Sequence, residues 1–205
     1  MPDMDNGFFA FISRMKYINR WALMRNSYTE NISEHSLEVS MLVHALCVIG
    51  NKRLAKNLDV GKAVLAAMYH DASEIITGDM PTPVKYLNQD IKGAYKDIEA
   101  KANNRILNML PDDMREAYRE IFFPETSGME YELKLVKAAD KLSALIKCVE
   151  EEKMGNVEFT SAGKTLEKSV KDMGLKEAEI FMEEFLPAYH LTLDELNAGC
   201  TERKD

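Results

Sequence analysis

Two histidines and two aspartates in this chain together form a complete set of ligands for one divalent transition metal. They are His35, the adjacent pair His70 and Asp71, and Asp140. Each lies in a stretch whose apolar residues predict a buried helix face. An ionised carboxylate in such a place costs several kcal/mol unless its lost hydration is replaced. Because a metal ion would replace it, the set predicts a metal-dependent hydrolase.

We expect one ion per chain, because the two remaining histidines are poorly placed. His44 follows His35 by nine residues, about 180° around an α-helix, and so points away from any site that His35 serves. His190 lies after Pro187 near the C-terminus, outside the predicted helical core. A ligand set of nitrogen and oxygen accepts Co²⁺, Mn²⁺, Cu²⁺, Zn²⁺ or Fe²⁺.

Glu74 is the predicted proton-transfer group. It follows His70 by four residues and Asp71 by three, so on a helix the three side chains share one face. Its carboxylate could take a proton from a water molecule or give one to a leaving oxygen. The alternative is a hydrogen bond to a ligand histidine, and the sequence leaves both roles open.

Positive charge for an anionic substrate gathers near the N-terminus. Residues 6–29 contain no Asp or Glu but include Arg20, whose guanidinium can donate two parallel hydrogen bonds to a phosphate. Trp21 offers a flat surface for a base or sugar, and a bulky ring beside C2′ would disfavour a ribose. The alternatives are scattered surface bases and a tryptophan that anchors the core.

A proline-rich segment after the second predicted helix is expected to form a rigid loop. Asp79, Met80, Pro81 and Thr82 precede Pro83, and two prolines in three positions make the segment rigid. Asp79 could accept a hydrogen bond from a sugar 3′-hydroxyl or could cap the turn.

The elements that must position these residues all have helical patterns, so the predicted fold is all-α and a single domain over residues 1–205. No run shows sustained alternation of β-branched residues. Ser33 is the expected N-cap of a helix that ends at Gly50, and a second helix is expected over Val60–Ile76. Further helices are expected at Asp90–Leu110, Pro111–Arg119, Glu130–Met154, Lys164–Met173 and Leu175–Leu186, before a short tail.

Composition restricts the partners. The net charge of −8 argues against nucleic-acid polymers and anionic membranes. No stretch approaches the roughly 20 apolar residues of a membrane span, and no secretory signal is recognised. Three cysteines without framework spacing fit a reducing cytoplasm.

The spacing of His35, His70–Asp71 and Asp140 resembles the H…HD…D signature of the HD-domain metal-dependent phosphohydrolases, which implies a helical bundle with a single metal site between helices. Longer strings are similar to the bacterial 5′-deoxynucleotidases of the YfbR type, over nearly the whole chain. These strings are residues 18–21 (INRW), 29–36 (TENISEHS), 69–74 (YHDASE), 77–86 (TGDMPTPVKY) and 147–151 (KCVEE).

The resemblance implies hydrolysis of deoxyribonucleoside 5′-monophosphates to deoxynucleoside and phosphate, by a cytoplasmic homodimer. It implies that His35, His70, Asp71 and Asp140 bind the metal, three of which (His35, Asp71 and Asp140) also face the substrate. It further assigns acid/base catalysis to Glu74, the phosphate to Arg20, and the nucleoside to Trp21 and the loop Asp79, Met80, Pro81 and Thr82.

Two other functions are compatible with the same residues. One is an HD-domain hydrolase of phosphodiesters or nucleoside polyphosphates. The other is a non-catalytic helical dimerisation or regulatory module with a structural metal, although such a site needs neither Glu74 nor Arg20.

Overall fold

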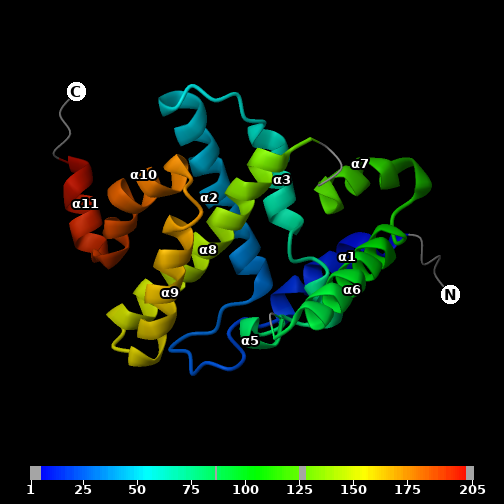
Figure 1. Cartoon of the computed structure of the whole chain (residues 1–205), viewed down its shortest axis with the longest axis horizontal. Helices are drawn as coiled ribbons and strands as arrows, with labels where there is room; N and C mark the ends of the chain where they lie inside the picture. The colour runs from blue at the N-terminus through cyan, green and yellow to red at the C-terminus, as the bar shows by residue number, and fades with distance from the viewer. Residues whose placement is uncertain (1–5, 86, 125–127, 202–205) are drawn as a thin grey trace.

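Helices joined by short turns make up the fold of the computed structural model, which describes residues 6–85, 87–124 and 128–201 (Figure 1). Within these ranges the extended pairing is limited to an isolated antiparallel bridge between Asn19 and Asn31, so the all-α prediction is confirmed. Tyr86 of the fourth string lies outside the described residues. The elements are α1 (Phe8–Ile12), η2 (Ser13–Tyr17), α2 (Ile32–Arg53), α3 (Val60–Tyr69), α4 (Glu74–Thr77), α5 (Thr82–Lys85), α6 (Gln89–Leu107), α7 (Asp112–Phe122), α8 (Glu130–Lys153), η4 (Val157–Phe159), α9 (Thr160–Lys171), α10 (Lys176–Glu184), η5 (Leu186–His190) and α11 (Leu193–Thr201).

The main core lies where α2 and α8 cross and α3 packs beside them, with α9 and α10 on one side (Figure 1). Small residues of α3, including Ala63 and Ala67, are fully buried and allow its close approach to the other two helices. Branched side chains of α2 and α8 fill the interior, among them Val43, Leu46 and Leu142. This crossing brings the N-terminal turn of α2 beside the middle of α8, where two of the predicted metal ligands lie.

A second, aromatic core holds α1, α6 and α7 against the end of α3. Phe8, Tyr118 and Phe122 form edge-on and tilted ring contacts around Tyr69, and Ala72 is buried in the same cluster. Because Tyr69 and Ala72 flank His70 and Asp71, this core fixes the position of the predicted ligand pair.

The predicted boundaries of α2 are wrong at both ends. Asn31, not Ser33, is the N-cap: its side chain accepts the backbone N–H groups of Ser33 and Glu34, and Glu34 accepts the N–H of Asn31 in return. Gly50 lies inside the helix, which continues to Arg53. A Cβ at position 50 would lie 2.7 Å from Leu58 Cδ1, so glycine is needed there for close packing and not as a stop.

The helix predicted over residues 60–76 is interrupted. α3 ends at Tyr69, residues 70–73 form turns, and α4 begins at Glu74. The segment 79–83 is also only partly a loop, because α5 begins at Thr82. The expected C-terminal tail contains α11. In each case the tertiary contacts or local turns override the apolar pattern of the sequence.

Contrary to the sequence prediction, α2 is long and apolar enough to cross a membrane by length and composition. However, 56% of its most apolar window is buried inside the protein. This apolar character serves the core described above, which α2 shares with α3 and α8.

Candidate active site

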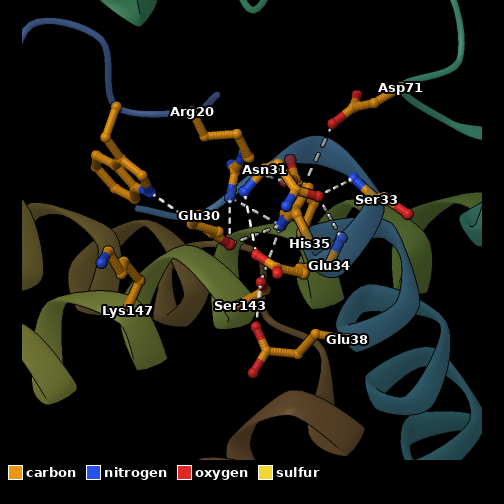
Figure 2. Close-up of polar contacts among 12 residues, drawn as sticks. Arg20, Glu30, Asn31, Ser33, Glu34, His35, Glu38, Asp71, Ser143 and Lys147 are labelled. Atoms are coloured by element: carbon orange, nitrogen blue, oxygen red, sulfur yellow. Dashed lines mark hydrogen bonds and ion pairs between the residues drawn. The ribbon is translucent and has the colours of Figure 1, made fainter. Parts of the chain in front are cut away.

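Three of the four predicted ligands lie together at the junction of α2 and the turn after α3. One donor atom from each of His35, His70 and Asp71 lies within 4.8 Å of the others. Asp71 Oδ2 is 3.5 Å from His35 Nε2 and 3.2 Å from His70 Nε2. Figure 2 shows Asp71 directed at His35 from the opposite chain segment.

Asp140 completes the group from α8. Its Oδ1 lies 3.1 Å from His35 Nε2. The predicted burial of each ligand in a helix face holds for His35, which is 0% exposed, but is wrong for Asp140, whose side chain is 44% exposed. The reason is that Asp140 lines an open cavity, so its carboxylate can face both His35 and a molecule in that cavity.

The chemistry of these donors fits a divalent ion. Nε2 of His35 and Nε2 of His70 are buried, and among the described residues neither has a hydrogen-bond partner of acceptable geometry. His70 Nδ1 lies 2.7 Å from the carbonyl oxygen of Ala67 and donates a proton to it, so Nε2 is the nitrogen that can bind a metal ion once its own proton is lost. Two imidazoles and two carboxylates are a ligand set suited to a first-row transition metal.

The other nitrogen of His35 lies in a polar network that selects its tautomer. Ser143 donates its hydroxyl proton to Glu38 at 2.5 Å, and Ser143 Oγ is 3.0 Å from His35 Nδ1 (Figure 2). Arg20 Nη1 lies 2.8 Å from the same nitrogen. Nδ1 accepts from Arg20 in one tautomer and donates to Ser143 in the other. Only the second leaves Nε2 free to bind a cation.

Electrostatics around the group keep its carboxylates ionised. Burial opposes this, but the positive charge of His70 outweighs burial at Asp71 and lowers the pKa of that carboxyl. The contact with His35 Nε2 at 3.1 Å likewise lowers the pKa of Asp140. In return, Asp71 and Asp140 overcome the effect of burial and raise the pKa of His70 to about 9. A metal ion would replace this imidazolium proton, so binding releases a proton.

Glu74 lies beside Asp71 although the two do not share a continuous helix. The turn at 70–73 gives a hydrogen bond from the Glu74 N–H to the Asp71 carbonyl at 2.9 Å. Burial, with the nearby charges of Asp71 and Asp79, raises the pKa of Glu74 to about 10. Its Oε2 is buried and, within the described part of the chain, has no hydrogen-bond partner. A carboxyl in this environment holds a proton at neutral pH.

Glu30 connects Arg20 and Trp21, a role that no sequence pattern predicted. One carboxylate oxygen accepts Arg20 Nη1 at 3.1 Å, and the other accepts the indole N–H of Trp21 at 2.7 Å (Figure 2). Arg20 is 13% exposed, and Glu30 and Asp140 outweigh burial to raise the pKa of its guanidinium. Glu30 therefore orients the predicted phosphate ligand and its aromatic neighbour together.

Trp21 has both of the roles that the sequence left open. Its ring packs 5.3 Å from that of Phe159, and it also lines the open cavity. Its φ of 61° is rare for a non-glycine residue and costs conformational energy. The backbone N–H of Trp21 faces the Asp79 carboxylate and partly offsets the effect of burial, which raises the pKa of that carboxyl, so the proline-rich loop lies beside this strained residue. Gly78, at φ 72°, makes the turn that directs Asp79 there.

A cavity of about 450 Å³ opens beside this group. The predicted Arg20, Trp21, Asp140 and loop 79–82 all line it, and a wall from α9 was not foreseen because its residues carry no motif. The lining residues are Arg20, Trp21, Ala22, Leu23, Met24, Asp79, Met80, Pro81, Thr82, Pro83, Asp140, Lys141, Ala144, Ser161, Ala162, Thr165 and Leu166.

The two remaining histidines lie apart from this group. His44 is exposed on α2 and lines a separate groove against α10, and His190 ends η5. Both positions agree with the sequence prediction.

The sequence comparisons agree with one another over nearly the whole chain. A family model described as 5′-deoxynucleotidase YfbR-like matches residues 7–189. A 5′-deoxynucleotidase of Erwinia tasmaniensis is 50% identical over 190 residues, covering 93% of this chain and 96% of that protein. A 5′-deoxynucleotidase of Shewanella oneidensis is 47% identical over 189 residues, which cover 92% of this chain and 96% of the Shewanella protein.

Solved structures share the fold at low sequence identity. An HD-domain phosphohydrolase from Listeria innocua superposes with a TM-score of 0.76 at 20% identity, covering 96% of this chain and 98% of its own. A cyanophage S-2L HD phosphohydrolase, bound to dA and one catalytic Zn²⁺ ion, gives a TM-score of 0.63 at 20% identity, covering 87% of this chain and 95% of its own.

The buried position of Glu30 predicts a large loss of stability on its removal. Glu30→Ala leaves the Arg20 guanidinium without its closest carboxylate, so we expect the free energy of unfolding to fall by about 3 kcal/mol. Urea unfolding monitored by circular dichroism measures it.

Glu184→Ala is the matched control, because it breaks the Arg53–Glu184 pair, in which both side chains are about half exposed. That variant should lose about 1 kcal/mol or less. Equal losses in the two variants would show that the Arg20–Glu30 pair behaves as a surface ion pair.

Proposed function

The chain belongs to the YfbR-like family of 5′-deoxynucleotidases, and from that premise we propose how its residues release phosphate from a deoxyribonucleoside 5′-monophosphate. The protein is a hydrolase, and the phosphodiesterase and non-catalytic alternatives have no such support. The single observation that carries the proposal is the convergence of His35, His70 and Asp71 on Asp140 and Arg20, two residues that line the open cavity.

His35, His70, Asp71 and Asp140 bind one divalent cation. The buried, unpartnered Nε2 atoms and the short distances from His35 to both carboxylates support this ligand set. When bound, the ion supplies positive charge to the phosphate and lowers the pKa of a coordinated water. Co²⁺, Mn²⁺, Cu²⁺, Zn²⁺ and Fe²⁺ all suit these donors. Asp140, His35 and Asp71 also face the phosphate.

Arg20 orients the phosphate. Glu30 holds Nη1, while Nη2 lies 4.0 Å from Asp140 at the cavity wall. The remaining N–H donors can bind two phosphate oxygens in parallel. This geometry holds the phosphorus between the cation site and the cavity, with the nucleoside directed along the cavity.

Glu74 transfers the proton. With its raised pKa, the Glu74 carboxyl can donate from Oε to the leaving 5′-oxygen and recover a proton from water afterwards. Its buried position beside Asp71 keeps the proton source out of bulk solvent.

Trp21 and the loop Asp79, Met80, Pro81 and Thr82 bind the nucleoside. The indole ring is held on one side by Phe159 and on its N–H by Glu30, so it cannot yield to an extra substituent. A 2′-hydroxyl against this ring would be desolvated without a partner, at a cost of roughly 1–3 kcal/mol. Asp79 accepts a hydrogen bond from the 3′-hydroxyl group of the sugar.

The protein acts as a homodimer in the cytoplasm. Exposed apolar side chains along one side of α2, at Leu37, Met41 and Val48, supply a surface for a second copy. The free, buried Cys47 and Cys148 are consistent with a reducing compartment.

Removal of one ligand should remove the metal. For Asp140→Ala we expect metal content to fall from one ion per chain to nearly none after dialysis, because a lost ligand weakens binding strongly. Elemental analysis measures this, with circular dichroism to establish folding. Asp97→Ala, an exposed mid-helix aspartate in α6, is the control and should retain the ion. Unchanged metal in the Asp140 variant would contradict the ligand assignment.

Glu74→Gln should separate proton transfer from metal binding. We expect kcat for dAMP to fall by about 10²-fold or more, because the amide cannot donate a carboxyl proton. Metal content should stay at one ion per chain. A Glu74→Gln variant that turns over at the wild-type rate would exclude Glu74 from the mechanism.

The substrate assignment is tested by phosphate release from dAMP, AMP and 3′-AMP with each metal in turn. We expect dAMP to be hydrolysed preferentially, and Trp21→Ala to narrow the dAMP-to-AMP ratio of kcat/KM by about tenfold. Equal rates on dAMP and 3′-AMP would contradict the function. If Trp21→Ala lowers kcat/KM equally for dAMP and AMP, Trp21 does not discriminate between the two sugars.

A further inference from the structure

Trp21 belongs to a loop between residues 19 and 31 whose two ends pair with each other. The Asn19–Asn31 bridge closes this loop, with hydrogen bonds from Arg20 N to Glu30 O and from Ile32 N to Ile18 O, both at 2.9 Å. Residues 21–24 of this segment line the cavity. No helix or strand pairing supports residues 21–28 themselves, within the part of the chain that the structure describes.

A buried ion pair at the C-terminal end of α8 meets this segment. Lys147 Nζ lies 2.5 Å from Glu151 Oε1, and the side chains are 2% and 0% exposed. Both residues belong to the string KCVEE at 147–151, for which the sequence alone predicts no role.

Each member of the pair binds the backbone of the segment. Lys147 donates to the carbonyl oxygen of Tyr28 at 2.9 Å, and its ammonium lies 3.2 Å from the centre of the Tyr28 ring. Both oxygens of Glu151 lie within hydrogen-bond distance of the Ser27 N–H, at 2.9 and 3.1 Å. Asn156 joins the two sides, donating to Glu151 and to the Arg25 carbonyl, each at 2.8 Å.

Stability alone does not account for this arrangement. Replacing a buried ion pair by well-packed apolar residues is often neutral or stabilising, because the charges lose their hydration. Apolar residues, however, could not bond the Ser27 N–H or the Tyr28 carbonyl. Hydrogen bonds from Lys147, Asn156 and Ser27 outweigh burial and lower the pKa of Glu151 to about 2, so the carboxylate stays ionised as their acceptor.

We propose that Lys147 and Glu151 are positioning residues that hold the 21–28 segment against α8, and thereby place Trp21 and Arg20 at the nucleotide. The inference rests on the proposed function for the role of Trp21 and Arg20. The path is short: Glu151 and Lys147 bind residues 27 and 28, Phe159 beside them packs on the Trp21 ring, and Glu30 ties that ring to Arg20.

The test uses the full chain with the double substitution Lys147→Met and Glu151→Met, which removes both charges together, and circular dichroism establishes that the variant is folded. Trp21 is the only tryptophan, so intrinsic fluorescence reports on this segment directly. We expect emission at longer wavelength, stronger quenching by acrylamide, and a KM for dAMP raised about tenfold. Metal content under saturating metal should be unchanged and kcat should change less than KM. Glu151→Gln, which leaves Lys147 charged, should show the same fluorescence change at a temperature where circular dichroism is unaltered.

Lys56 and Glu177 provide the matched control at a distant point of the bundle. Lys56 Nζ lies 2.7 Å from Glu177 Oε1, and Tyr131 donates to the same carboxylate at 2.9 Å. The double substitution Lys56→Met and Glu177→Met removes a Lys–Glu–Tyr network of similar chemistry. It should change stability without changing Trp21 emission or KM.

Two outcomes overturn the proposal. One is wild-type emission, quenching and KM in the Lys147/Glu151 double variant, which would leave the pair a purely structural role. The other is a loosened Trp21 with a wild-type KM, which would show that the segment does not act on nucleotide binding. Failure of the proposed function is separate, because it would show as no phosphate release from dAMP by the unsubstituted chain.

Discussion

Buried negative charge is the constraint on which the rest of this site depends. Asp71, Glu74, Asp79 and Glu30 lie in the same region of a helical core, and Arg20 interacts with three of these carboxylates and with Asp140. One guanidinium does not balance them: burial, with the charges of Asp71 and Asp79, raises the pKa of Glu74 to about 10, while Asp71 and Asp140 overcome burial and raise the pKa of His70 to about 9. A divalent cation would supply the missing positive charge at the point where two unpartnered imidazole nitrogens meet two carboxylates. The same surplus of negative charge would repel a phosphate dianion, and the positive charge of Arg20 offsets that repulsion.

The backbone departs from regular helix at the residues that carry or contact these carboxylates, namely the turn at 70–73 and Trp21. The turn at 70–73 frees the His70 side chain to bond the Ala67 carbonyl and directs Asp71 toward His35, which a continuous helix would not do as readily. At Trp21 a positive φ is sustained by two interactions: the indole ring packs on Phe159, and the indole N–H donates to Glu30. Such strain persists only where surrounding contacts determine it, and Trp21 lines the cavity.

Residue types predicted which side chains would gather: His35, His70, Asp71 and Asp140 do lie together, as expected if a cation is to balance carboxylates placed beside apolar helix positions. The fold class followed from periodicity, and the family from continuous strings. Glu30, Ser143 and Glu38 were missed because an isolated glutamate or serine carries no pattern, and their roles arise only when α2, α8 and the 19–31 loop meet. The predicted helix boundaries were wrong at three places. A capping box moves the start of α2 from Ser33 to Asn31, a close contact with Leu58 accounts for Gly50 inside the helix, and a turn interrupts the helix at residues 70–73. A sequence pattern does not contain those distances.

The site divides into two halves that share Glu30 and Arg20. On one side, Ser143 and Glu38 select the His35 tautomer that leaves Nε2 free for a cation. On the other, Glu30 couples Arg20 to Trp21, and the Lys147–Glu151 pair fixes the segment from which both project toward the cavity. Arg20 Nη1 contacts Glu30 and also lies 2.8 Å from His35 Nδ1, so its guanidinium belongs to both halves. The two halves are therefore joined by one residue, because the guanidinium that lines the cavity also contacts the ring of a predicted metal ligand.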